Sequence, residues 1–349
     1  MMRLLLPAIL LTVTVCPARG QKMAESGPIP ARTLTYSGRE MTLKSVVAEL
    51  GKQSALEIDI TALDPTLPIK GMFEKQEFWQ VADLLAEQTN SRVVVGQQGK
   101  PVRLLPLGKL LRTPVSSDGP FRIVARDVET RLDLQTGKAV YDLTLEIAWE
   151  SRLPVYRVDA QPRLTKGEGD AGRPITVKPF DARMPVSGVV TTTRVRLEGI
   201  SRDSKQIKIL QGTFRATAAE EMLRLSFDDV TKPTAKKDKG VEVALRKFEK
   251  EGSFWIADIV LHYPETSAVF ESFETYWLSR NRIVLTAPDG TTKHTTDDAE
   301  INGNAIRYRF KEGKAFAPAN LKSWRLEYET PGPMREVPIQ FELKGIMLP

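Results

Sequence analysis

The chain has 349 residues, of which 41% are hydrophobic and 27% are charged, and its formal net charge is +6. This composition is typical of a globular chain and excludes a disordered or fibrous protein. This small excess of positive charge argues against a nucleic-acid-binding surface, which concentrates Lys and Arg on one face. The length favours three small domains over one large domain.

The first 20 residues have the pattern of an export signal. Arg3 precedes the apolar run 4–15, and Ala18 and Gly20 supply small residues at −3 and −1 of a cleavage site before Gln21. A helix of this length is too short to cross the roughly 30 Å hydrocarbon core of a bilayer. We therefore expect a periplasmic or secreted protein with no transmembrane segment after cleavage.

The only cysteine, Cys16, lies inside this expected signal. Lipidation at Cys16 is the alternative to cleavage, but a lipobox needs a very small residue where Val15 stands. After cleavage the chain has no thiol and two histidines, so it lacks a disulfide and a Cys-built metal site.

Two helices with the same apolar spacing are predicted near the start of the chain. Thr42 stands in the N-cap position of the first helix. Residues 47–50 and 81–84 align at a shift of 34. The apolar positions follow the i, i+3, i+4, i+7 pattern and are Leu43, Val46, Val47 and Leu50, then Phe78, Val81, Ala82 and Leu85. Strands are predicted around them at 34–36, 56–60, 69–73, 93–95 and 102–105.

Residues 34–107, above all the stretches 42–50 and 78–85, resemble the short N-terminal domain of secretins and TonB-dependent outer-membrane receptors. In that family the domain is non-catalytic and mediates periplasmic contacts. The resemblance therefore implies an α+β docking module at 33–107. It stops at this module, so channel formation and transport are not implied. A generic small α+β domain with the same helix spacing is the alternative.

Beyond residue 121 the alternating pattern of β-strands replaces the helical spacing. One shift of 114 residues aligns two alternating stretches, Tyr141, Leu143, Leu145, Ile147 and Trp149 with Trp255, Ala257, Ile259, Leu261 and Tyr263. The same shift aligns Ile207, Leu210, Phe214, Leu223, Leu225 and Phe227 with Leu321, Trp324, Tyr328, Val337, Ile339 and Phe341. The shared shift predicts two tandem copies.

Short strands with turn residues at 136–137, 289–290 and 302–303 are typical of an antiparallel sandwich. We expect two Ig-like β-sandwich domains at 121–230 and 241–349. The polar stretches 108–120 and 231–240 are expected to be linkers. The predicted fold is therefore an α+β N-terminal domain followed by two mainly-β domains.

A dinucleotide-binding pattern, G-x-G-x-x-G, occurs at residues 167–172. That motif needs a helix after the third glycine, but Arg173, Pro174 and a β-like segment follow here. Glu168 and Asp170 would also repel phosphate. A flexible loop is the favoured interpretation.

Residues 298–303 resemble the start of a calcium loop, in which oxygen ligands alternate before a glycine. The twelfth position is Arg309, where a bidentate carboxylate should stand. A hairpin turn at Asn302-Gly303 explains the same residues.

No pattern of a nucleophile with its base is present in the sequence. His262 is expected to face solvent, and His294 lies in a Thr-rich turn. The carboxylate pairs Asp228-Asp229 and Asp297-Asp298 would point to opposite faces of a strand, which makes each a poor acid–base pair. We therefore assign no catalytic, cofactor-binding or metal-binding residue.

The aromatic residues Phe270, Phe273, Tyr276 and Trp277 form the remaining candidate site. With helical spacing they make one apolar stripe, so a short helical plug packed on a sandwich is the favoured interpretation. With strand spacing one ring is exposed and is available to a partner or a sugar.

These observations favour an exported, non-enzymatic protein of the cell envelope that acts through protein or glycan binding or assembly. The alternative is a carbohydrate- or peptidoglycan-modifying enzyme that uses paired carboxylates across a cleft.

Overall fold

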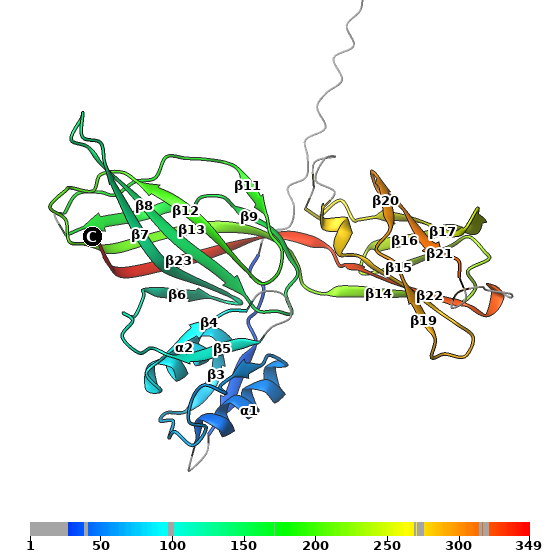
Figure 1. Ribbon diagram of the computed structural model, residues 1–349, viewed down its shortest axis with the longest axis horizontal. Coiled ribbons are helices and arrows are strands. Elements are labelled where there is room, and N and C mark those ends of the chain that lie inside the picture. The colour runs from blue at the N-terminus through cyan, green and yellow to red at the C-terminus, as the bar shows by residue number, and fades with distance from the viewer. Residues whose placement is uncertain are drawn as a thin grey trace, which may run out of the picture.

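The computed structural model describes residues 27–37, 41–96, 101–170, 172–268, 270, 276–313, 316 and 321–349. The expected signal at 1–20, with Cys16, lies outside them. Within them the protein is mostly β, with two α-helices and several antiparallel sheets, which confirms the expectation of a β-rich chain of several units. Figure 1 shows a small helix-containing unit beside one β lobe and a second β lobe joined to the first by long strands.

The N-terminal unit contains two small sheets and both α-helices. Strands β1 and β3 pair antiparallel, while β5 pairs with β2 in parallel and with β4 antiparallel. The elements are β1 (Thr33–Tyr36), α1 (Leu43–Ser54), β2 (Ile58–Asp59), β3 (Phe73–Glu77), α2 (Phe78–Gln88), β4 (Ser91–Val94) and β5 (Val102–Pro106).

Both predicted helices are present with the expected buried faces. Thr42 caps α1, because its side chain accepts a hydrogen bond from Ser45 N while the Ser45 hydroxyl accepts one from Thr42 N. Of the predicted face residues, seven are fully buried, and Val47 is only partly buried against the same core. The seven are Leu43, Val46, Leu50, Phe78, Val81, Ala82 and Leu85. Trp79, which was not among the predicted face residues, is also fully buried.

The N-terminal unit is fixed to the first lobe by buried polar contacts. Trp79 Nε1 donates to the Pro120 carbonyl over 2.9 Å. Arg122, whose side chain is 7% exposed, donates to Asp83 with its Nη2 at 2.7 Å and its Nε at 3.1 Å. A guanidinium and a carboxylate that pair at a largely buried position specify one geometry. The N-terminal unit is therefore docked on the first lobe rather than tethered to it by a linker alone.

The first lobe consists of two antiparallel sheets around one core. One sheet has the order β12-β8-β7-β6, with β6 (Val115–Asp118), β7 (Phe121–Leu132), β8 (Ala139–Trp149) and β12 (Val190–Leu197). The other contains β9 (Val155–Asp159), β10 (Arg163–Gly169), β11 (Arg183–Pro185), β13 (Gln206–Ala219) and β23 (Met334–Met347). Leu145 and Ile147 of the first sheet share the core with Phe214 and Ile339 of the second.

The second lobe also has two antiparallel sheets around a core. One has the order β15-β16-β17-β21-β20, with β15 (Thr234–Asp238), β16 (Val241–Glu251), β17 (Phe254–His262), β20 (Ala299–Asn302) and β21 (Ala305–Lys311). The other has the order β14-β22-β18-β19, with β14 (Met222–Phe227), β18 (Arg282–Thr286), β19 (Lys293–Thr295) and β22 (Arg325–Pro331). Two 3-10 helices are η1 (Tyr276–Arg280) and η2 (Leu321–Ser323).

One two-stranded ribbon runs through both lobes. Strand β13 pairs with β23 in the first lobe, and β14 pairs with β22 in the second. The register is the same throughout: Gln206 lies opposite Met347, Ala219 opposite Met334, Met222 opposite Pro331 and Phe227 opposite Leu326. At about 3.3 Å per residue the ribbon is about 70 Å long. Figure 1 shows it crossing between the lobes.

This ribbon corrects the expected domain boundaries. Strand β14, expected in the first sandwich, packs in the second core through Leu223, Leu225 and Phe227. Strand β23, expected in the second sandwich, packs in the first core. At the shift of 114, β13 corresponds to β22 and β14 to β23. The alignment therefore assigns β14 to the end of the first lobe and β23 to the end of the second, but in the structure each of these two strands lies in the other lobe. The second lobe is thus inserted between β13 and β23.

Both expected linkers are also partly wrong. In the stretch 108–120, residues Val115–Asp118 form β6 and pair with β7. In the stretch 231–240, residues Thr234–Asp238 form β15 and pair with β16. Both are edge strands. Edge strands tolerate lysines and other exposed polar residues, which explains why their composition suggested linkers.

Candidate functional site

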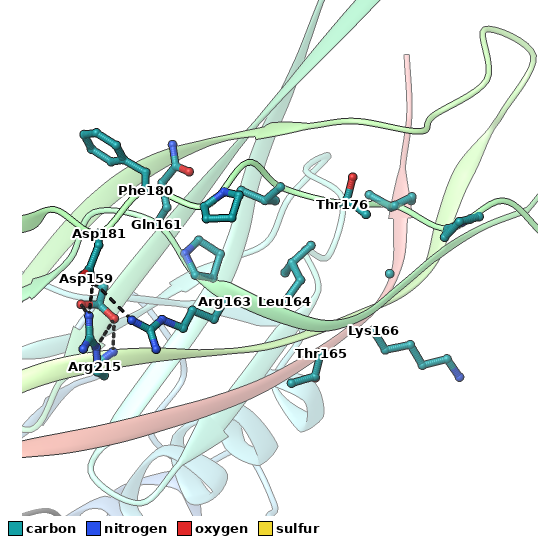
Figure 2. Close-up of a pocket in the computed structure, with 16 residues that line it drawn as sticks. Asp159, Gln161, Arg163, Leu164, Thr165, Lys166, Thr176, Phe180, Asp181 and Arg215 are labelled. Carbon is teal, nitrogen blue, oxygen red and sulfur yellow. Dashed lines mark hydrogen bonds and ion pairs between the residues drawn. The ribbon is translucent and has the colours of Figure 1, made fainter.

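A large cavity lies inside a sheet of the first lobe. After β10 the chain turns back and runs antiparallel to β9 and β10. At one end Ile175 N donates to the Gly167 carbonyl over 2.9 Å, and at the other Ala160 N donates to the Ala182 carbonyl over 2.8 Å. Between these ends the facing stretches 161–166 and 176–181 separate and leave a cavity of about 660 Å³. We call this space the sheet gap (Figure 2).

Two features of the sequence explain why the two rims of the sheet gap do not pair. Pro162 on one rim and Pro179 on the other have no N–H to donate, so a continuous ladder between the rims would be broken. Thr176 bonds elsewhere, because its N–H and carbonyl exchange hydrogen bonds of 3.0 and 2.8 Å with Glu198 beside β12. This rim is therefore held toward the opposite sheet.

The first glycine of the discounted dinucleotide pattern, Gly167, has a structural use at one end of the sheet gap. A Cβ on Gly167 would lie 2.4 Å from the Ile175 carbonyl oxygen. Gly199, at a φ of +89°, allows a similarly close approach of Pro174. The expected flexible loop at 167–172 is wrong at its start, because Gly167 and Gly169 belong to β10.

The walls of the sheet gap are largely apolar. Leu164 and Val177 are partly buried and Ile175 is fully buried, and all three pack on the first core. Phe180 is 60% exposed at the outer rim. Gln161 also lines the gap, and its buried Oε1 has no hydrogen-bond partner among the described residues. A ligand that offers an N–H would satisfy this oxygen.

One end of the sheet gap is charged. The Asp159 carboxylate, 5% exposed, accepts hydrogen bonds from Arg215 N at 2.9 Å and from Arg215 Nε at 3.0 Å. The same guanidinium donates to Asp181 over 2.6 Å, and Arg163 donates to Asp181 over 3.3 Å (Figure 2). Hydrogen bonding to Arg215 lowers the pKa of Asp181, and Asp159 raises the pKa of Arg215. These charges neutralise one another.

From Asp159 a row of polar and charged side chains, which we call the charged row, continues across the sheet toward the second lobe. It is formed by Arg183, Glu336, Thr217 and Arg157. Arg183 lies 3.8 Å from Asp159 and donates to Glu336 of β23 over 2.6 Å. Thr217 also donates to Glu336, over 2.9 Å, and accepts from Arg157 over 2.8 Å. The row thus joins β9, β11, β13 and β23 on one face.

The row ends at the junction between the lobes, where the predicted aromatic group lies. The Arg157 guanidinium stands 4.4 Å from the centroid of the Phe270 ring. Phe270 stacks on Trp277 with centroids 5.3 Å apart and meets Tyr276 edge-on at 6.3 Å. Tyr276 and Trp277 begin η1. Phe273 lies outside the described residues.

The described members of the aromatic group pack within the chain. Phe270 and Trp277 are partly buried against a small cluster shared by both lobes, formed by Tyr156, Ala219, Ala268 and Met334. This agrees with the packing interpretation. Contact of the group with a partner stays a prediction.

The other residues singled out in the sequence lie elsewhere in the second lobe. His262 is exposed, and His294 lies against Phe316 with ring centroids 4.8 Å apart. Asp228 pairs with Arg325 over 3.1 Å, and Asp229 caps a turn at Thr231. Each of these groups is remote in sequence and sheet from the sheet gap.

The calcium-like stretch is a hairpin. Asn302 lies opposite Ala305, and Gly303 and Asn304 form the turn between β20 and β21. Arg309 pairs with both Asp298 and Glu300. Within the described part of the chain, no group of three or more metal-ligating side chains is close enough to hold an ion.

The sheet gap was not predicted from the sequence. The available signal was three prolines, Pro162, Pro174 and Pro179, close to the glycine pattern in a stretch with strand-like alternation. Prolines spaced in this way interrupt strand pairing.

The comparisons with known proteins give no relative. No family model, no curated protein and no solved structure matches this chain. No helix in the described ranges is long and apolar enough to span a membrane.

Proposed function

We propose that this chain is an exported, non-enzymatic binding or assembly protein of the cell envelope, and that its partner, a protein or a glycan, occupies the sheet gap. The observation that carries the proposal is a cavity of about 660 Å³ with apolar walls in the plane of a sheet. Pockets of this size and lining are typical of binding sites.

The N-terminal unit supports the same proposal. Its resemblance to the short N-terminal domain of secretins and TonB-dependent receptors implies a docking module, and two helices with two small sheets are compatible with that role. Because Asp83 and Arg122 hold the unit on the first lobe, a contact made by the unit would place the sheet gap at a defined position. The proposal also takes the two lobes as Ig-like copies, since β6-β7-β8-β12 and β15-β16-β17-β21 follow the same order.

The enzyme alternative would need two carboxylates in one cleft with different protonation states. Asp159 and Asp181 do share the charged end of the sheet gap. However, both are hydrogen-bonded to Arg215, and the pKa of Asp181 is lowered, whereas a general acid needs a raised pKa. The electrostatics of the gap therefore favour binding over acid–base catalysis.

Site-specific photo-crosslinking tests the proposal. A photoreactive phenylalanine analogue in place of Phe180 stands at the rim of the sheet gap, and one in place of Leu134, 86% exposed on the β7–β8 turn, is the matched control. We expect an envelope protein or glycan adduct from position 180 and none from position 134. Equal adducts at both positions, no adduct at 180, or hydrolysis of an envelope polysaccharide that Asp159→Asn abolishes would refute it.

A further inference from the structure

We infer that the ligand of the sheet gap is an extended polypeptide segment that enters as an added β-strand along the outer edge of β10. This inference rests on the proposed function and specifies its partner. It selects a polypeptide over a glycan.

The hydrogen-bonding capacity of the backbone is the first reason. One edge of β10 pairs with β13, where Arg163 lies opposite Thr213 and Leu164 opposite Gly212. On its other edge, the described residues show no backbone hydrogen bond between 161–166 and 176–181. An unpaired edge recruits a strand, because the strand supplies the missing donors and acceptors.

The length of the sheet gap is the second reason. The hydrogen bonds at Ala160–Ala182 and Gly167–Ile175 close it at both ends, and six residues on each rim lie between them. Six residues of extended chain span about 20 Å. The space therefore suits a peptide of about six residues that completes the sheet where its own rims fail to meet.

The chemistry of the walls is the third reason. Leu164, Ile175 and Val177 offer aliphatic contacts, and Phe180 supplies the one aromatic ring among the described residues that line the gap. Sugar rings stack on flat aromatic surfaces, of which the described lining offers only Phe180, whereas aliphatic walls suit alternate side chains of a strand. The buried Gln161 Oε1 provides an acceptor for a peptide N–H.

The charges define the preferred peptide. Arg215 is shared by Asp159 and Asp181, and Lys166 has Glu168 at 3.9 Å. With the charges of the gap already paired, an uncharged segment with apolar residues at alternate positions fits best. A charged residue in the middle of the segment would be desolvated without a partner.

Selection from a random hexapeptide library on the full-length protein is the test. We expect enriched peptides with alternating apolar residues that protect the amides of 163–166, 177–178 and 180–181 from hydrogen exchange. N-methylation of alternate peptide residues should weaken binding at least about tenfold, because it removes the N–H donors of one edge.

Two variants separate the sheet gap from other surfaces. Thr165→Trp places a large side chain on an exposed residue that lines the gap, and Lys208→Trp places the same side chain on an exposed residue of β13 outside the lining. Both should unfold at the urea concentration of the parent chain. The first should abolish peptide binding and the second should leave it unchanged.

The remaining outcomes distinguish this inference from the proposed function. If chitohexaose protects the same amides and no peptide does, the polypeptide inference is overturned and binding in the sheet gap stands. If peptides bind equally well after N-methylation or to the Thr165→Trp variant, strand addition is overturned. If neither probe binds and position 180 gives no crosslink, both proposals fall.

Discussion

Phe214 of β13 lies directly opposite Ile339 of β23 in the core of the first lobe. The whole second lobe is inserted between these two residues along the chain. Each lobe is consequently completed by a strand that the tandem interpretation would give to the other.

Ile339→Ala should therefore destabilise the first lobe. Ile339 is fully buried, and loss of a buried aliphatic side chain lowers the free energy of unfolding by about 2–5 kcal/mol. Hydrogen exchange followed by mass spectrometry should show faster exchange in β8 than in β17. Leu225→Ala, in β14, is the matched variant and should give the reverse. Faster exchange in β17 for Ile339→Ala would contradict the strand exchange.

Gly167→Ala should destabilise the closed end of the sheet gap. Its Cβ would lie 2.4 Å from a backbone oxygen that cannot easily move, and overpacking of this kind costs about 1–3 kcal/mol. Gly169→Ala is the control, because its Cβ meets neighbours at an ordinary 3.8 Å. Urea unfolding measures both. Equal stability of the two variants would remove the structural explanation for Gly167.

The stability of the protein should respond to the titration of Glu150. Its side chain is fully buried between the lobe and the N-terminal segment, where it accepts from Arg32 N at 2.8 Å and from Arg152 Nε at 2.6 Å. Burial raises the pKa of Glu150 above 4.5. The folded state therefore binds this proton more tightly than the unfolded state, and the contribution of Glu150 to stability falls as pH rises from about 4.5 through the raised pKa.

Glu150→Gln removes this titration. Urea unfolding between about pH 4 and about pH 7 should show a flatter dependence for the variant than for the parent chain over that window. If the parent chain instead gains stability relative to the Glu150→Gln variant as the pH rises through this window, the upward shift of the Glu150 pKa is wrong.

Arg280 should hold the two lobes in one orientation. It extends from η1 of the second lobe, and its guanidinium donates to the Val155 carbonyl over 2.6 Å and to the Val186 carbonyl. It also stands 4.8 Å from the centroid of the Tyr156 ring. Burial lowers the pKa of Arg280.

Arg280→Ala removes both hydrogen bonds, and each buried carbonyl left without a partner costs about 1–3 kcal/mol. Small-angle X-ray scattering should then give a broader distribution of interatomic distances. Arg282→Ala, two residues later and exposed, is the control and should leave the distribution unchanged. An unchanged distribution for both variants would show that other contacts fix the lobes.

The local elements could be predicted from the sequence, because their signals are local. The Thr42 cap and the buried faces of α1 and α2 depend on residues within a few positions of one another. The alternation at Leu143, Leu145 and Ile147 predicts a buried strand face, and all three side chains are fully buried.

Strand partners could not be predicted in the same way. The alternation of Leu225 and Phe227 predicts that one face of the strand is buried, but these side chains could pack equally well in the core of the first or of the second lobe. The choice depends on the chain continuing in the same direction through Glu220 and Glu221, between β13 and β14, rather than folding back. The sheet gap was missed for a related reason, because it arises where two facing segments with Pro162 and Pro179 do not bond.

The ribbon also decides how the protein resists tension. A force that pulls the lobes apart acts along the axes of β13–β14 and β22–β23, so the ladders within each lobe are loaded in shear and their hydrogen bonds must break together rather than unzip one after another. Because two chain segments cross the junction, β13 to β14 and β22 to β23, cleavage of one leaves the other to carry the load.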